Sequence, residues 1–243
     1  MITHSLGVRK THMASQLADL RTLLERRFPD AVPVTHRTAG GVATGIAELD
    51  RALPGGGLPR GRMAAWAPGG GATAVLRAAC RAVTARGERA AWIDGAGTAC
   101  GDAWRGEAAL LRPTGEREAL ECAEELVRSG GFALVVLAGA RAADVERVRL
   151  SRAVREGGGA LAMLDEGGFM AGVRVASRIR PEAYRWRPGP FGEPAEVDSV
   201  AVRARVESLG WSREAEFSLS VESHDLRLSL EPALADRRGA GAR

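Results

Sequence analysis

Apolar and polar positions are arranged in two different ways along the chain, and the change falls near residue 173. Before it, short apolar runs predict buried strands at residues 62–67, 90–94, 132–137 and 160–164. Between these runs, apolar side chains recur at helical spacing and predict helices over residues 45–53, 73–86, 116–129 and 142–155. Strands that alternate with helices imply a parallel sheet with right-handed crossovers, so the expected fold class is α/β.

After residue 173, apolar and polar residues alternate with a period of two. This pattern predicts further strands at residues 173–179, 200–206, 217–221 and 226–230. Strands with one apolar face commonly pair antiparallel, so we expect them to extend the sheet at its C-terminal edge. The core domain is expected over residues 37–232, and the small, charged residues 233–243 are expected to form a flexible tail.

The N-terminal region is expected to lie outside this core. Residues 1–13 carry no pattern and predict a disordered leader, and residues 14–36 predict a helix followed by a short extended stretch. The apolar face of that helix consists of Leu17, Leu20, Leu24 and Phe28. This face either docks on a partner or packs against the chain's own core, and the sequence leaves both alternatives open.

Composition narrows the class of protein. A chain of 243 residues with 45% hydrophobic content suits one packed domain. Its net charge of +4 is carried almost wholly by arginine, because Lys10 is the only lysine. This charge is compatible with a nucleic-acid or acidic partner, and equally with an arginine-rich genome. Cys80, Cys100 and Cys122 lack the spacing of a metal site or disulfide framework, which predicts a cytoplasmic protein without a bound metal. No apolar run reaches membrane-spanning length, so no membrane partner is expected.

A glycine-rich segment joins the first predicted strand to the following helix. Gly69, Gly70 and Gly71 stand where a phosphate-binding loop, G-x-x-x-x-G-K-[ST], would cradle a nucleotide. Thr73 occupies the lysine position and Ala74 the position of the magnesium-binding hydroxyl. We therefore predict no cofactor and no catalysis at this loop. Two alternatives stay open: weak nucleotide binding through backbone amides, or a tight turn with no ligand.

The residues before this loop resemble the entry to the ATPase core of RecA recombinases. The stretch 44–53 reads T-G-I-A-E-L-D-R-A-L, and residues 56–62 follow as G-G-L-P-R-G-R. The resemblance covers roughly residues 40–165 and implies a RecA-like core. It also places Ala96 where the family has a water-activating glutamate, and Leu137 where it has an aspartate that supports magnesium. Phosphoryl transfer depends on positioning and charge stabilisation, so the loss of all these groups predicts a pseudo-ATPase and not an enzyme.

The reduced RecA-like frame resembles the ImuA family, sometimes grouped with SulA-like proteins, of bacterial damage-induced mutagenesis cassettes. This resemblance implies a non-catalytic adaptor in the DNA-damage (SOS) response, cytoplasmic and nucleoid-associated. Its implied partner is ImuB, an inactive relative of Y-family polymerases, in error-prone translesion synthesis. RecA and an error-prone polymerase subunit are further candidate partners. The segment F-x-x-A that begins at Phe28 resembles an oligomerisation pattern of some recombinases.

Two other features carry candidate chemistry. Arginines interleave with Tyr184 and Trp186 in a mixture typical of single-strand nucleic-acid platforms; these are Arg178, Arg180, Arg185 and Arg187. Strict alternation would place the two aromatic rings on the face opposite Arg185 and Arg187, which favours a half-buried edge strand instead. Asp165 and Glu166 follow a predicted strand and are expected to form a solvated turn. The alternatives to the adaptor are thus a DNA-binding module that uses arginine-rich strands, and a nucleotide-binding regulator with a lysine-free loop.

Overall fold

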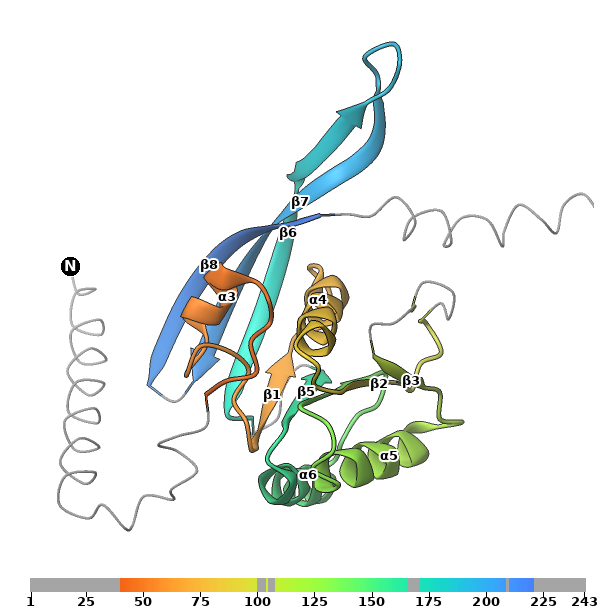
Figure 1. Ribbon diagram of the computed structural model, residues 1–243, viewed down its shortest axis with the longest axis vertical. Helices are drawn as coiled ribbons and strands as arrows, with labels where there is room; N and C mark the ends of the chain where they lie inside the picture. The colour runs from red at the N-terminus through yellow and green to blue at the C-terminus, as the bar shows by residue number, and fades with distance from the viewer. Residues whose placement is uncertain (1–39, 100–103, 105–107, 166–170, 209, 221–243) are drawn as a thin grey trace, which may run out of the picture.

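The computed structural model describes residues 40–99, 104, 108–165, 171–208 and 210–220, which form one mixed sheet flanked by helices (Figure 1). The apolar positions Leu17, Leu20, Leu24 and Phe28, and the strand expected at 226–230, lie outside these residues. The leader and the tail expected at the two ends also lie outside them.

The sheet contains eight strands in the order β3-β2-β4-β5-β1-β6-β7-β8. Its first half is parallel and consists of β1 (Arg62–Trp66), β2 (Ala90–Asp94), β3 (Ala109–Leu111), β4 (Leu134–Ala138) and β5 (Ala160–Leu164). β6 (Val173–Pro188) runs parallel to β1, and β7 (Pro194–Ser208) and β8 (Trp211–Ser220) continue the sheet antiparallel. The expected α/β class, with antiparallel strands at the C-terminal edge, is confirmed.

Helices cover the two faces of the parallel half unequally. α4 (Ala72–Ala85) packs on one face through Val75, Leu76 and Ala79. α5 (Glu116–Arg128) and α6 (Asp144–Gly157) pack on the other face, where Val135 and Leu137 of β4 are buried. Alanine and valine dominate both layers, and such small side chains let the helices approach the sheet closely. None of the helices in the described part of the chain is both long and apolar enough to cross a bilayer.

Four strands differ clearly from expectation: β3, β6, β7 and β8. β3 was not predicted, because its apolar run, residues 108–111, is only four residues long. β6 and β7 continue past residues 179 and 200 as a two-stranded arm that projects from the body (Figure 1). The arm is paired through its backbone and its side chains are mostly exposed, so no buried face marked it in the sequence. β8 begins at Trp211, before the expected residue 217, because pairing with β7 extends over its whole length.

The short helix α3 (Ala47–Ala52) is held by a hydrogen-bonded staple within the T-G-x-x-x-L-D segment. Both the backbone N–H and the hydroxyl of Thr44 donate to Oδ1 of Asp50, each over 2.8 Å. The Thr44 hydroxyl in turn accepts the N–H of Ile46 over 3.2 Å. Thr44 and Leu49 are fully buried, and α3 packs beside β8. The T-G-x-x-x-L-D segment therefore holds the chain in place before it enters the sheet, through hydrogen bonds and packing.

Asp50→Ala is predicted to destabilise the protein by about 1–3 kcal/mol, because it leaves the buried N–H and hydroxyl of Thr44 without their acceptor. Urea unfolding followed by circular dichroism measures this change. The matched control is Glu48→Ala on the same helix, whose exposed ion pair with Arg51 at 3.4 Å contributes little. Equal losses of stability in the two variants would contradict the staple.

Candidate functional site

The glycine-rich loop connects β1 directly to α4. Gly69, Gly70 and Gly71 all have positive φ, at 96°, 54° and 82°. Three successive left-handed residues are accessible to glycine and costly for any residue with a Cβ atom. Gly71 caps α4, which begins at Ala72, one residue before the predicted start.

The loop packs against the backbone of β6. The N–H of Ala67 donates to the carbonyl of Val175 over 2.8 Å. A Cβ atom on Gly70 would overlap the carbonyl oxygen of Ser177, and one on Gly71 would lie 2.9 Å from Cδ1 of Ile179. The glycines therefore allow a close approach between the loop and β6, in addition to the turn into the helix.

Some backbone N–H groups at the start of α4 donate hydrogen bonds to carbonyls of the loop itself and are therefore not available to a ligand. The N–H of Ala72 donates to the carbonyl of Gly69 over 3.0 Å, and the N–H of Val75 donates to that of Gly71 over 3.0 Å. Thr73 and Ala74 are exposed at the start of α4. The first cation along this helix is Arg77, whose guanidinium lies 4.9 Å from the ring centroid of Trp104. This interaction directs Arg77 toward an aromatic ring of the body.

The two positions expected to have lost catalytic side chains lie in different environments. Ala96 is exposed in the loop after β2 and lies against Gly139. A Cβ atom added to Gly139 would collide with Ala96. Leu137 is 1% exposed and packs in the apolar cluster under α5 and α6, on the face opposite α4. The acid at the end of β2, Asp94, is buried and accepts hydrogen bonds from Thr98 and Ala99. Its carboxylate therefore holds the loop after β2 in place.

Asp165 at the end of β5 is buried, and the expectation of a solvated turn is wrong for it. Its carboxylate pairs with the Arg147 guanidinium of α6 at 2.6 Å, with side-chain exposures of 9% and 12%. Arg147 also donates through Nε to the carbonyl of Ala142 over 2.9 Å. Arg147 lies 18 residues away from Asp165 in the chain, so the residues next to Asp165 did not indicate this pair. Glu166 lies outside the described residues.

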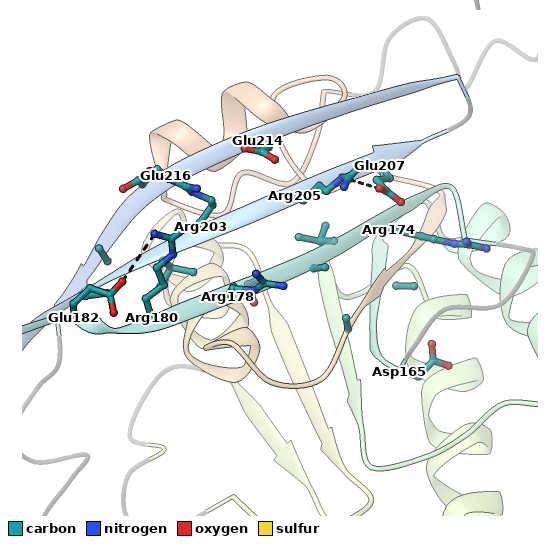
Figure 2. Close-up of a pocket in the computed structure, with 18 residues that line it drawn as sticks. Asp165, Arg174, Arg178, Arg180, Glu182, Arg203, Arg205, Glu207, Glu214 and Glu216 are labelled. Carbon is teal, nitrogen blue, oxygen red and sulfur yellow. Dashed lines mark hydrogen bonds and ion pairs between the residues drawn. The ribbon is translucent and has the colours of Figure 1, made fainter. Parts of the chain in front are cut away.

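A groove of about 790 Å³ runs along the outer face of β6, β7 and β8. We call it the arginine groove, because five arginines line it: Arg174, Arg178, Arg180, Arg203 and Arg205 (Figure 2). It lies on the same face of the sheet as α5 and α6. Those helices pack on the parallel strands, and no helix in the described part of the chain covers this face of β6–β8. Alanines 65, 67, 176 and 201 also line the groove.

The strand register sets the charges of the groove against one another. Arg178 of β6 lies directly opposite Arg203 of β7, and Arg203 lies opposite Glu216 of β8. The Arg203 guanidinium donates to Glu216 over 2.9 Å, and this hydrogen bond is the main cause that raises the pKa of Arg203 above its usual value. Arg205 pairs with Glu207 at 2.8 Å. Arg178 makes no ion pair with any residue in the described ranges.

The four predicted nucleic-acid residues are thus divided between two places. Arg178 and Arg180 line the arginine groove, whereas Arg185 and Arg187 lie on the projecting arm. Arg187 donates to Asp198 over 2.8 Å, and this hydrogen bond raises the pKa of Arg187. The negative charge of Asp198 thus balances the positive charge of Arg187. Sequence reasoning missed Arg203 and Arg205, although their alternation with Val202, Ala204 and Val206 placed them on the polar face of the predicted strand.

The aromatic residues of the arm are more exposed than predicted. Tyr184 is 41% and Trp186 54% exposed, so the expectation of a half-buried edge strand is wrong here. β6 lies between β1 and β7 in the sheet, and its pairing with β7 shifts register between Arg185 and Trp186. The extra residue at this shift is Asp198 on β7, so rings and arginines still alternate from Tyr184 to Arg187 along β6.

Fold and site together define an α/β protein with a mixed sheet, a glycine-rich strand-to-helix loop and an arginine-lined groove. No protein-family model matches the chain, and no curated protein compared with it matches significantly. Within the ranges that the structure describes, no three His, Cys, Asp or Glu side chains gather where they could hold a metal ion.

Gly70→Ala is predicted to destabilise the protein by about 2 kcal/mol or more beyond the loss caused by Gly69→Ala. Both substitutions force a side chain into a positive φ, but only the one at Gly70 collides with the backbone of β6. Urea denaturation of the two variants measures the difference. Similar losses would show that the turn alone, without the contact to Ser177, requires glycine.

Arg178→Gln is predicted to raise Tm by about 1–2 °C, because it removes a like-charge pair directly across two strands. Arg203→Gln is the contrasting variant, since it also removes the bond to Glu216 and should lower Tm or leave it unchanged. Differential scanning calorimetry at low salt compares the two. A fall in Tm for Arg178→Gln would mean that this arginine has a stabilising partner.

Proposed function

We propose that this protein is a non-catalytic adaptor with a RecA-like core, which works in damage-induced translesion synthesis and binds an ImuB-type polymerase-like protein. The observation that carries the proposal is the loop between β1 and α4. It keeps three left-handed glycines at the position of a nucleotide cradle, yet Thr73 and Ala74 supply neither the cation nor the metal-supporting hydroxyl of a working site.

The surroundings of the loop support this proposal. The mixed sheet, with antiparallel strands at its C-terminal edge, is compatible with the architecture that the RecA resemblance implies. Neither Ala96 nor Leu137 offers an acid, and Leu137 is enclosed in an apolar cluster. The neighbouring carboxylates of Asp94 and Asp165 are engaged in structural bonds. Because phosphoryl transfer needs a positioned base and charge stabilisation together, this edge of the sheet is better suited to holding a shape than to turnover.

The implied partner surface includes the N-terminal apolar positions Leu17, Leu20, Leu24 and Phe28. An amphipathic helix binds a partner by laying its apolar face into a groove, and its affinity then depends on a few large anchors. Phe28 is the largest of the four and serves as the first position to test.

The purified protein is predicted to capture the ImuB-type protein equally well with and without magnesium-ATP, and to release no phosphate above background. Phe28→Ala is expected to weaken capture at least about tenfold, as for a typical aromatic anchor. The matched control is Val145→Ala on α6, a large apolar side chain that is 74% exposed elsewhere. ATP-dependent capture, or magnesium-dependent phosphate release abolished by altering Thr73, would overturn the adaptor and favour a nucleotide-binding regulator.

A further inference from the structure

β8 is the outermost strand of the sheet, and one of its two edges is open. The strand has ten residues, and β7 is the only described strand that pairs with it. An edge of this kind presents a row of backbone N–H and C=O groups, and natural sheets usually cover or blunt it. The outer edge of β8 is therefore a position where a further strand can pair.

The apolar face of β8 carries the main core up to this edge. Ala215 and Phe217 are buried, and Leu219 is half-buried against the same cluster. α3 packs beside β8 (Figure 1), and a hollow of about 440 Å³ lies between them. Ala52 and Ala215 supply the apolar part of its lining. The rest of the lining is charged and consists of Glu48, Arg51, Arg213, Glu214 and Glu216. Apolar side chains of a further strand would thus find room beside those of β8.

The sequence that follows β8 has a second period-two pattern. Residues 226–234 read L-R-L-S-L-E-P-A-L, so an apolar residue stands at every even position. The polar residues 222–225, which read E-S-H-D, separate this stretch from β8. Two alternating stretches joined by a short polar loop are typical of a β-hairpin. Since β8 ends at Ser220, the second stretch begins within a few residues of the open edge.

The position of the loop sets the register of such a hairpin. A hairpin that turns symmetrically within residues 222–225 places Leu228 opposite Leu219. It also places Leu230 opposite Phe217. In this register every even-numbered residue of the stretch falls on the apolar face of β8, whereas a shift by one residue would move all of them to the opposite, charged face. The apolar pattern of the stretch therefore matches the face that β8 buries.

The remaining pairs of this register suit an outermost strand. Pro232 lies opposite Ala215, and proline is tolerated on an edge strand, where no further strand needs its N–H. On the charged face, Glu231 lies opposite Glu216, which is an unfavourable pair. Glu216 is already bonded to Arg203 at 2.9 Å, and this bond reduces the repulsion. Burial of a leucine contributes more than an exposed like-charge pair costs, so the apolar face decides the register.

We infer that residues 226–234 dock on the outer edge of β8 as a further antiparallel strand, with their leucines packed against Leu219, Phe217 and the hollow beside α3. The segment thereby closes the edge, so that neither a second copy of this chain nor a strand of another protein pairs with β8 while it is bound. The inference gives the strand expected at residues 226–230 its neighbour and its register. It goes beyond the adaptor role, which requires nothing of this edge.

A disulfide across one proposed pair tests the register in the full chain. Leu219→Cys with Leu228→Cys places two thiols directly opposite, within the Cα–Cα range of about 4.4–6.8 Å that a disulfide spans. Mild oxidation is expected to link them within one chain, and peptide mass spectrometry distinguishes this link from any to the three native cysteines. The matched control, Leu219→Cys with Ser229→Cys, places the thiols on opposite faces and is expected to link at least about fivefold less.

Substitutions on the two faces of the segment test its packing. Leu228→Asp places a charge on the buried face and is expected to lower Tm by at least about 4 °C. Ser229→Asp adds the same charge on the other face, opposite Ser218, and is expected to change Tm by less than about 1 °C. Hydrogen exchange in the peptide that covers β8 should become at least about tenfold faster in Leu228→Asp and stay unchanged in Ser229→Asp.

Three results would overturn the inference. A disulfide that joins two chains instead of closing within one would assign the edge to a second copy. Equal linking by both cysteine pairs would show that the segment has no fixed register on β8. A Tm of Leu228→Asp equal to that of the parent would show that the leucines are not packed. Capture of the ImuB-type protein is measured separately, so a failed adaptor role would leave the disulfide result intact.

Discussion

The close approach of the glycine loop to β6 is the contact on which the arrangement of this protein depends. The chain must leave β1, turn, and start α4 within a few residues, while the backbone of β6 occupies the space beside the turn. Gly70 and Gly71 meet both demands, because they adopt positive φ and have no Cβ atom to collide with Ser177 or Ile179. Together with the β1–β6 ladder, this contact joins the parallel half of the sheet to its antiparallel extension. The same glycines that characterise a nucleotide cradle therefore have a sufficient structural role here.

The unequal helical cover of the sheet leaves one face of β6–β8 open. α5 and α6 bury one face of the parallel strands, and the same face of β6–β8 is left to charged side chains. The opposite face of these strands is apolar and joins the main core through Val175, Val202 and Phe217. The buried face of these strands holds them in the sheet, so their open face can carry charged side chains. The arginine groove is a consequence of where the helices end.

The class of fold and most element positions could be predicted from the chain, because they depend on local periodicity. The boundaries of β6 and β7 could not, since the arm is held by backbone pairing and lacks a buried face at Tyr184 and Trp186. Arg178 and Arg180 were recognised as candidates, but Arg203 and Arg205 were missed because they are close to them only in the folded sheet. The burial of Asp165 was missed for the same reason, since Asp165 follows β5 and its partner Arg147 lies on α6.

The sequence by itself determined the alternation of strands and helices and the change to period-two strands after residue 173. It also determined that Thr73 stands at the lysine position of a phosphate loop, Ala74 at its hydroxyl position and Ala96 at the position of the acid. These are properties of residue type and spacing along one segment. Only the tertiary structure decided that Gly70 rests on β6, that Asp165 is neutralised by α6, and that Arg178 faces Arg203 across two strands. Each of these depends on residues far apart in the chain, and their pairing is set by sheet register and helix packing, which no local pattern encodes.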